Sequence, residues 1–217
     1  MQLYNYFRSS ASFRVRIALE LKGLRYDYLG VHLQRNEQHS AAFAERNPLK
    51  LVPLLVDGEQ SISQSLAIIE YLDETHPAPP LLPADALGRA RVRSLALDIA
   101  CEIHPLDNLR VLRYLVKDLG VSEDAKNTWY RHWVDTGLAA LETRLAHDLA
   151  SGVHAGPFCH GPTPTLADCV LVPQIFNARR FNCALDAVPT VMAVFDSCMA
   201  LPAFQAAQPS RCPDNEV

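Results

Sequence analysis

The sequence predicts an α/β domain with a mixed sheet, followed by an all-helical domain. Residues 1–75 alternate short apolar runs, which are typical of strands, with segments of helical periodicity. Four prolines between Pro77 and Pro83 then interrupt the pattern, because proline cannot continue a helix. Only helical patterns follow this break. With 217 residues, the chain is long enough for two small domains.

Strands and helices alternate in the first domain, which we place at residues 1–80. Apolar runs predict strands over Leu3–Phe7, Tyr26–Leu33 and Val52–Val56. Asp57-Gly58 is a typical hairpin turn, and it predicts a short return strand around Ile62. Helical periodicity predicts helices over Ser12–Leu24, Ser40–Glu45 and Ser65–Glu74. The order β-α-β-α-β-β-α implies a mixed sheet covered by helices.

The second domain, which we place at residues 87–217, shows helical patterns alone. Pro105 interrupts its first long segment and predicts a kink there. Thr165 and Asp168 have the spacing of a capping box, which makes Asp168 structural rather than catalytic. Helices are predicted over Leu87–Leu119, Glu123–Leu149, from Thr165 onward, and over Val188–Met199 and Ala203–Ala207.

Composition and charge argue against several classes of function. The net charge is -4 and no Lys/Arg tract is present, so a nucleic-acid partner is not expected. The sequence shows neither a secretory signal nor an apolar run long enough to cross a bilayer. The six cysteines lie far apart without a C-x-x-C pair, which predicts free thiols and a cytoplasmic protein. The eight histidines have no metal-ligand spacing, so no metal is expected.

A group of serines lies where the first predicted strand gives way to a helix. Ser9, Ser10 and Ser12 fall near the helix N-terminus, where unpaired N–H groups and the positive end of the dipole favour an anion such as a thiolate. A plain N-cap explains the same residues, and the local pattern alone favours that simpler interpretation. Arg8 adds a positive charge beside the serines.

Two further pairs in the first domain are candidates for ligand contacts. Val52-Pro53 opens an apolar strand, where proline fits only at the strand start. A cis peptide there would turn the backbone of Val52 toward a ligand, but a trans proline ending a loop fits equally well. Gln64-Ser65 precedes the next helix. Ser65 is either its N-cap or part of a site for a carboxylate, and the local pattern favours the cap.

Polar residues also gather around the predicted kink of the second domain. His104 and Asn108 share a helix face at i, i+4, as cleft-lining residues would. Arg110 has the spacing to pair with Asp107 on the surface. Arg180 and its neighbour Arg179 end a helix, where the dipole favours cations without any function.

These features recur together in extended motifs. The motifs are F-R-S-S-A-S-F-R-V-R-I-A-L from Phe7, N-P-x-x-x-V-P from Asn47, Q-S-L-A-I-I-E-Y-L-D-E from Gln64, H-P-L-D-N-L-R-V-L from His104 and T-P-T-L-A-D-C from Thr163, with V-P-Q downstream. On these motifs the chain resembles the zeta class of glutathione transferases over nearly its full length. Within that class it is most similar to the bacterial isomerases of maleylacetoacetate, with the maleylpyruvate isomerases as near relatives.

The resemblance implies a fold, a cofactor and a partner. The fold is a thioredoxin-like N-terminal domain with an all-helical C-terminal domain that contributes the substrate site. The cofactor is glutathione, and the protein is a homodimer. The implied reaction is the cis–trans isomerisation of maleylacetoacetate to fumarylacetoacetate in aromatic amino-acid catabolism, with maleylpyruvate as the alternative substrate.

The resemblance also implies roles for individual residues. Ser9 would donate a hydrogen bond to the glutathione thiolate, with Ser10 beside it and Arg8 completing the catalytic set. Val52 would bind the cysteinyl backbone through a cis Pro53. Residues matching other glutathione contacts are Gln64 and Ser65 at the γ-glutamyl end, and Gln38, His39, His104, Asn108 and Arg110. Those matching contacts to the dicarboxylate substrate are Arg8, Arg110 and Arg180.

One departure from the family pattern concerns the reactive sulfur. Many zeta enzymes have S-S-C at the turn, but this chain has Ala11 at the third position. The implied mechanism is covalent catalysis by the glutathione thiol, whose ordinary pKa is about 8.5: addition to the cis double bond, rotation, and release of the trans isomer. Ala11 means that the sulfur comes from glutathione and not from this position of the chain.

Two other functions fit the same fold. A general glutathione transferase or peroxidase would take apolar electrophiles, which the cationic Arg8, Arg110 and Arg180 disfavour. A non-enzymatic binding protein would not need the intact Ser9 and Gln64-Ser65. The sequence does not distinguish maleylacetoacetate from maleylpyruvate, because both carry two acidic ends and a cis enone.

Overall fold

A computed structural model of the chain describes residues 1–152 and 156–216. The chain divides into two compact units, Met1–Leu81 together with Met199–Val217, and Leu82–Cys198. The break after Leu81 falls within the proline-rich stretch. The expectation that residues 87–217 form one helical domain is wrong at its C-terminal end, because the last segment returns to the first unit.

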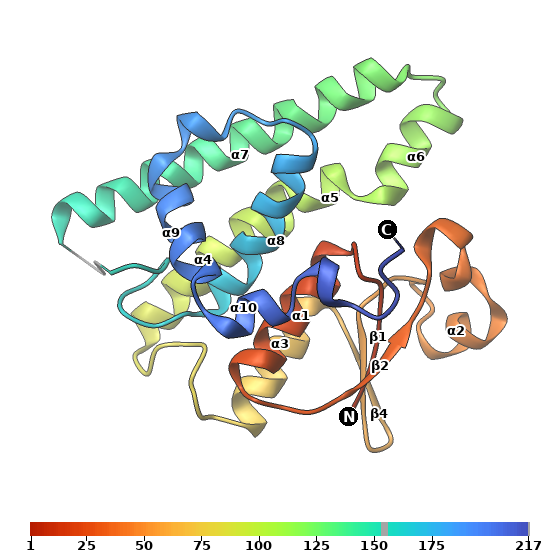
Figure 1. Ribbon diagram of the computed structural model, residues 1–217, viewed down its shortest axis with the longest axis horizontal. Coiled ribbons are helices and arrows are strands. Elements are labelled where there is room, and N and C mark those ends of the chain that lie inside the picture. Colours follow the sequence, from red (N-terminus) through yellow and green to blue (C-terminus); the bar gives the residue numbers. More distant parts are fainter. Residues whose placement is uncertain (153–155, 217) are drawn as a thin grey trace. The chain divides into compact units, whose positions relative to one another are not determined.

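The first unit contains a four-stranded mixed sheet (Figure 1). Its strands are β1 (Gln2–Asn5), β2 (Asp27–Gly30), β3 (Leu54–Asp57) and β4 (Gln60–Ser63), in the order β2-β1-β3-β4. The pair β1–β2 is parallel and the other two pairs are antiparallel. The predicted mixed sheet is confirmed, with strands shorter than the apolar runs suggested because Tyr6 and Phe7 already turn toward the first helix.

Helices cover the two faces of this sheet. They are α1 (Ser10–Leu21), α2 (Ala41–Arg46) and α3 (Ser65–Thr75), with short 3-10 turns at Leu33–Arg35, Glu37–His39 and Pro209–Arg211. Figure 1 shows α1 and α3 on one side of the strands and α2 on the other. The alternation of side chains along β1 fits this arrangement, because neighbouring residues point to opposite faces of the sheet. The ring of Tyr4 lies beside that of Phe43 on α2, and the preceding residue, Leu3, is fully buried.

Buried charged side chains bind the proline-rich stretch and the C-terminal segment to the rest of the first unit. Lys22, at the end of α1, pairs with Asp73 of α3 at 2.8 Å and donates to the carbonyls of His76 and Pro79. The short helix α10 (Pro202–Ala206) packs on α1. Arg16 of α1, only 1% exposed, donates to the carbonyl of Ala207 just beyond it.

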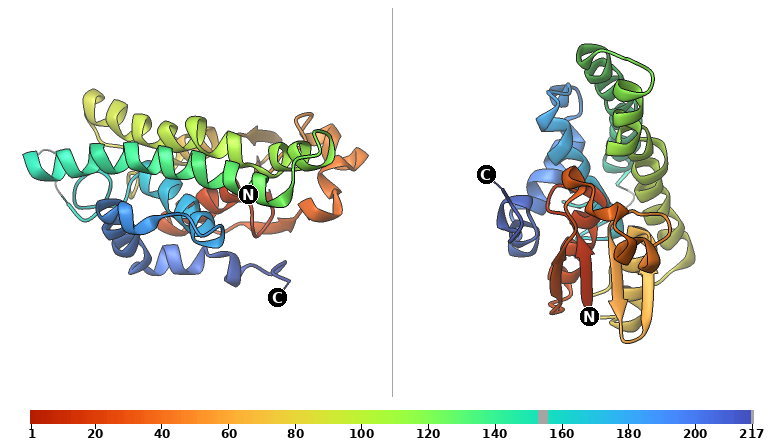
Figure 2. Two further views of the ribbon diagram at one scale, coloured as in Figure 1. Left: turned by 90° about the horizontal axis from the view of Figure 1, so that it is seen from above. Right: turned by 90° about the vertical axis from the view of Figure 1, so that its right-hand side faces the viewer.

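The second unit consists of helices. They are α4 (Ala86–Glu102), α5 (His104–Asp107), α6 (Leu109–Lys117), α7 (Glu123–Ser151), α8 (Leu166–Arg180) and α9 (Pro189–Met199), with a 3-10 turn at Leu185–Ala187. The long helices α4 and α7 lie side by side (Figure 2, left). α8 is its core helix, because every residue from Leu166 to Ile175 is buried.

Pro105 does not kink a continuous helix as predicted. The helix ends at Glu102, and Pro105 is the second residue of the separate short helix α5. Proline is tolerated in the first turn, where its missing N–H would have no partner anyway. The close approach of α7 fits this break, since a Cβ on Gly137 would lie 2.3 Å from the side chain of Ile103.

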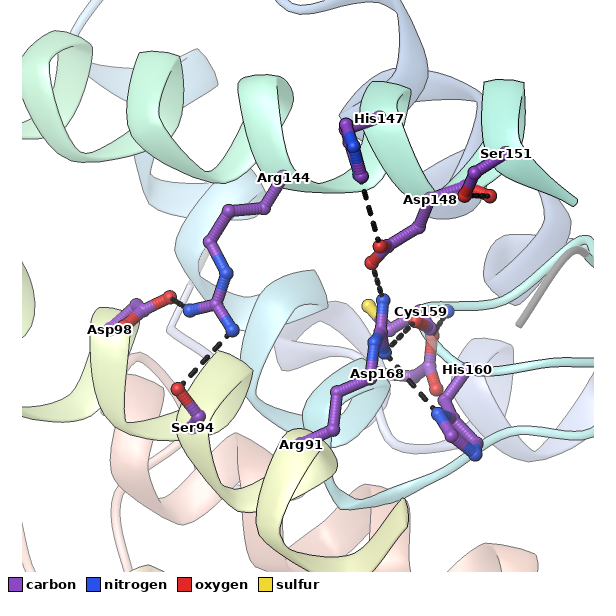
Figure 3. A network of polar contacts seen from close by, with 10 residues as sticks. All are labelled: Arg91, Ser94, Asp98, Arg144, His147, Asp148, Ser151, Cys159, His160 and Asp168. Atoms are coloured by element: carbon purple, nitrogen blue, oxygen red, sulfur yellow. Dashed lines mark hydrogen bonds and ion pairs between the residues drawn. The ribbon is translucent and has the colours of Figure 1, made fainter. Parts of the chain in front are cut away.

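A polar network surrounds the start of α8 (Figure 3). The capping box is confirmed: Asp168 accepts hydrogen bonds from the N–H of Thr165 at 2.7 Å and from its hydroxyl at 2.8 Å. It also accepts from the N–H of Cys159 at 2.8 Å. Arg91 of α4 bridges from the carbonyl of Cys159 to Asp148 of α7. Asp168 is thus structural, as the sequence indicated.

No helix in the described part of the chain is long and apolar enough to cross a membrane. All six cysteines are free. Burial raises the pKa of the Cys159 and Cys198 thiols, both of which lie near Asp168, so these sulfurs stay protonated and unreactive.

Candidate functional site

The turn between β1 and α1 places a serine hydroxyl at a helix N-terminus. Ser9 is the N-cap of α1, and its Oγ accepts from the N–H of Ser12 at 3.2 Å. The predicted helix start at Ser12 is wrong, because the helix begins two residues earlier, at Ser10, and Ser12 is buried inside it. A serine hydroxyl has one donor and two acceptor sites, so a cap that uses the oxygen leaves the hydrogen able to donate.

The α1 N-terminus provides a positive electrostatic environment. Ser10 is the first helical residue and is buried. No acidic side chain lies in the first turn of α1. The positive end of the helix dipole is therefore not neutralised from within the helix, which suits a thiolate held next to Ser9.

Val52 lies at the same end of the strands as the turn that carries Ser9. The Val52–Pro53 peptide bond is cis, as the resemblance implied. Pro53 directly precedes β3, so the proline is at the strand start rather than within the predicted strand. Because Leu54 pairs with Tyr4 in antiparallel register, Val52 lies toward the end of β1 from which the Ser9 turn departs. Tyr6, Phe7 and Val52 accordingly share one apolar cluster.

Gln64 and Ser65 also lie at this end of the strands. Ser63 pairs with Leu54, so the residues that follow β4 emerge beside the residues that precede β3. The expectation that Ser65 caps α3 is wrong: Gln64 is the N-cap, and Ser65 is the first helical residue. Gln64 adopts a left-handed φ of 71° and makes no side-chain capping bond. The first N–H groups of α3 therefore have no cap from Gln64, which suits a ligand carboxylate.

Arg14 connects the two helix starts. It is a buried residue of α1, and it donates to Ser65 Oγ at 3.3 Å. Its guanidinium places a fixed positive charge beneath the N-terminus of α3. Sequence reasoning did not single out Arg14, because charged residues between apolar ones in a helix are usually exposed, whereas Arg14 and Arg16 are both buried.

Gln38 and His39 follow β2 in a 3-10 turn over Glu37–His39. Gln38 is buried, and its Oε1 accepts no hydrogen bond from any described residue. His39 is exposed. An unsatisfied buried amide oxygen fits a site completed by a ligand donor, because leaving it unpaired is unfavourable. The first unit therefore fits a peptide-like ligand with an acidic end, as glutathione is.

The remaining predicted site residues belong to the second unit. Asn108 is the N-cap of α6, where its Oδ1 accepts from the N–H of Val111 at 3.2 Å and its Nδ2 donates to the carbonyl of Pro105 at 3.0 Å. His104 begins α5 and is half-buried. Arg110 and Arg180 are exposed, and Arg180 donates to Asn177 Oδ1 at 3.2 Å. The helix-face relation predicted for His104 and Asn108 is lost, because the chain leaves the helical path at Asn108.

Asp107 has an unusual environment that the sequence did not reveal. Its carboxylate is buried, and neither oxygen has a hydrogen-bond partner among the described residues. The predicted surface pair with Arg110 is therefore wrong. Burial raises the pKa of Asp107 to about 8. The Tyr130 phenol lies near Asp107 and Arg180, and its pKa is raised mainly by burial. The Tyr130 ring stacks on the ring of Phe181, with the ring centroids 3.6 Å apart.

Known proteins match the chain closely. Residues 1–74 match the family model described as glutathione S-transferase, N-terminal domain. A probable maleylacetoacetate isomerase of Vibrio cholerae is 50% identical over 98% of this chain and 97% of that protein. The chain belongs to the zeta class of the glutathione transferases. The predicted thioredoxin-like domain followed by helices is thereby confirmed as the fold of this zeta-class protein.

Two solved structures bear on the ligand. A holo maleylpyruvate isomerase, described as a bacterial zeta-class glutathione transferase, superimposes with a TM-score of 0.96 at 49% identity and covers both chains completely. A maleylacetoacetate isomerase of Methylobacterium extorquens AM1, with bound malonate and glutathione, gives a TM-score of 0.95 at 38% identity over the whole of both chains. Glutathione is the cofactor of this family. The uncapped α3 start and the unsatisfied Gln38 oxygen fit it.

Proposed function

We propose that this zeta-class protein is a glutathione-dependent cis–trans isomerase that converts maleylacetoacetate to fumarylacetoacetate. The observation that carries the proposal is Ser9. Its oxygen is used as a helix cap while its hydrogen remains able to donate at the N-terminus of α1. Relatives 42–50% identical to this chain carry the name maleylacetoacetate isomerase. Maleylpyruvate isomerase is the alternative, and it is the name of a relative 49% identical to the chain.

The residues of the first unit bind and polarise the cofactor in this proposal. The chemistry that bound glutathione supplies is reversible thiol addition to the cis double bond, with rotation about the single bond so formed. The Ser9 hydroxyl donates a hydrogen bond to the sulfur, and the α1 dipole favours its anionic form. Ala11 provides no competing thiol at this turn. The α3 N-terminus, with Ser65 and the buried Arg14, holds the γ-glutamyl carboxylate.

The arginines bind the substrate. Both candidate substrates carry two carboxylates, and an arginine guanidinium recognises a carboxylate with paired hydrogen bonds. Arg8 follows the β1 strand directly before Ser9, while Arg110 and Arg180 are exposed on the second unit. Positive charge also stabilises the enolate oxygen on which negative charge develops during addition. A general transferase for apolar electrophiles would have no use for this set of cations.

A substrate comparison with and without glutathione tests this proposal. Each cis diacid is incubated with the protein, and the absorbance of its trans product is followed. The proposal expects isomerisation only with glutathione, no net loss of glutathione, and the higher kcat/KM with maleylacetoacetate. A higher value with maleylpyruvate would move the assignment to the alternative. Failure to isomerise either compound would contradict the proposal.

A homodimer in the cytoplasm completes the proposal. The six free cysteines suit a reducing compartment. Leu87, Leu97 and Cys101 are exposed on α4 with spacings of ten and four residues, so they share one helix face. An exposed apolar face of this kind suits an interface with a second copy. Light scattering coupled to gel filtration would give the mass of a dimer, and L87E would reduce it if α4 forms the interface.

A further inference from the structure

The C-terminal tail, defined here as Cys212–Glu216, lies in the first unit and contacts the turn that carries Ser9. Asp214 is its central residue. One carboxylate oxygen, Oδ2, accepts from the N–H of Phe7 at 3.2 Å. The other, Oδ1, accepts a short hydrogen bond from the hydroxyl of Tyr28 on β2. Sequence reasoning gave no sign of these contacts, because more than 180 residues separate the partners.

Asp214 also lies next to Gly30 at the end of β2. A Cβ on Gly30 would be in ordinary van der Waals contact, at 3.6 Å, with both Cβ and Oδ2 of Asp214. Burial and the hydrogen bond to Asp214 raise the pKa of the Tyr28 phenol. Tyr28 therefore remains a donor at every physiological pH, and it fixes the orientation of Asp214.

The turn itself is held from its other side by Arg16. Ser9 closes the turn by donating its N–H to the carbonyl of Tyr6 at 3.0 Å. Arg16 donates to that same carbonyl at 3.4 Å and to the carbonyl of Phe7 at 3.0 Å. Both polar groups of Phe7 are thus engaged, the N–H by Asp214 and the C=O by Arg16. The direction in which the turn presents Ser9 depends on these contacts.

We propose that Asp214 is a positioning residue for Ser9, acting through the backbone N–H of Phe7. The inference rests on the proposed function, because it assigns Asp214 a part in orienting the Ser9 hydroxyl toward the glutathione sulfur. Asp214 touches neither cofactor nor substrate in this account. It fixes the turn so that the donor is in place before the cofactor binds, which is how a fixed dipole contributes most to holding an anion.

The test compares D214A, D214N and the matched control E216A. Glu216 lies two residues further along the tail and pairs with the side chains of the exposed Arg35 and, at 3.4 Å, of His32, rather than with the backbone of the turn. Three quantities are measured: the exchange rates of the Phe7 and Ser9 amides without glutathione, the pKa of the bound glutathione thiol from ultraviolet absorbance, and the steady-state constants.

D214A is expected to speed amide exchange, to raise the pKa of the bound thiol by about one unit and to lower kcat about tenfold. The KM for glutathione should stay within about threefold of the wild-type value, because the rest of its site is unchanged. D214N keeps one oxygen, which can accept from the Phe7 N–H while its NH2 group donates to the Tyr28 oxygen, so its constants should stay close to those of the wild-type protein. E216A should behave like the wild-type protein.

Two results would overturn the proposal. Faster exchange in D214A with an unchanged thiol pKa and kcat would show a purely structural role, and equal losses in D214A and D214N would show that the acceptor geometry is not what matters. Failure of the proposed function has a different signature, in which the wild-type protein itself neither binds glutathione nor isomerises either substrate. The positioning claim would then fall with it, although amide exchange would still report whether Asp214 holds the turn.

Discussion

Helices α1 and α8 both have a hydroxyl residue as their N-cap, but only at α8 does an acidic side chain of the first turn accept the hydroxyl hydrogen. At α8 the hydroxyl of Thr165 donates to Asp168, which also takes the N–H of Thr165. At α1 the oxygen of Ser9 accepts from Ser12, and no acidic side chain in the first turn takes up its hydrogen. The same local motif therefore stabilises the fold at α8, whereas at α1 it leaves the Ser9 hydroxyl able to donate a hydrogen bond.

A residue that caps a helix can therefore also bind a ligand. The sequence suggested a choice between cap and anion site for Ser9, and the geometry shows that the two are not exclusive. A serine N-cap uses its oxygen as an acceptor, whereas binding a thiolate uses its hydroxyl hydrogen as a donor.

Removing the closed cap should cost the most stability. D168A would leave the N–H groups of Cys159 and Thr165 buried without their acceptor, and we expect a loss of about 3–5 kcal/mol in the free energy of unfolding. S122A removes the simple cap of α7 and should cost only about 1 kcal/mol. Denaturant unfolding measures both, and equal losses would show that the network around Asp168 adds nothing to ordinary capping.

Asp107, which is buried without a hydrogen-bond donor among the described residues, should make the free energy of unfolding depend on pH. Burial raises the pKa of Asp107 from 3.8 to about 8, so between these values the native state retains a proton that the unfolded chain releases. The free energy of unfolding should therefore fall as the pH rises through this range and level off above about pH 8. After allowance for solvent screening, we expect D107N to remove a dependence on the order of 2 kcal/mol.

Unfolding of the wild-type protein, D107N and D186N at pH 5 and pH 8 measures this effect. Asp186 is exposed, so D186N should keep the pH dependence of the wild-type protein. Asp107 differs from Asp168 in having no hydrogen-bond donors among the residues that the structure describes. A D107N protein with the same pH dependence as D186N would contradict the contrast drawn between the two carboxylates.

A smaller effect is expected at the uncapped start of α3. S65A removes the hydroxyl that accepts from Arg14 and should raise the KM for glutathione about tenfold, with kcat nearly unchanged, because it weakens binding and not the chemistry. S63A, two residues earlier on β4, serves as the control. A fall in kcat without a change in KM would place Ser65 in the reaction itself.

The sequence predicted the elements that depend on local patterns. The strand and helix order of the first unit, the Asp57-Gly58 hairpin and the Thr165–Asp168 box all follow from neighbouring residues, and all are present. The first helix was predicted to begin at Ser12 instead of Ser10, and Ser65 was favoured as a cap, because serine is preferred near any helix start. The exact start of each helix then depends on how the preceding strand ends.

Features that depend on distant residues were missed. The return of the C-terminal segment to the first unit depends on buried contacts such as Arg16 with Ala207, which no periodicity encodes. The burial of Asp107 depends in the same way on how the helices of the second unit pack. The family motifs implied a set of site residues without these contacts, whereas the contacts of Arg14 and Asp214 became visible only in the structure.

The pKa of the glutathione thiol bound to S9A, compared with the wild-type protein and S122A, shows whether the Ser9 hydroxyl donates to the thiolate. Both variants remove a serine cap whose oxygen accepts at 3.2 Å, so the loss in helix capping is matched. We predict that the thiol pKa rises by about one to two units in S9A, with a fall in kcat of about tenfold to a hundredfold, and stays unchanged in S122A. A thiol pKa in S9A equal to that in S122A would contradict the assignment of Ser9 as the donor.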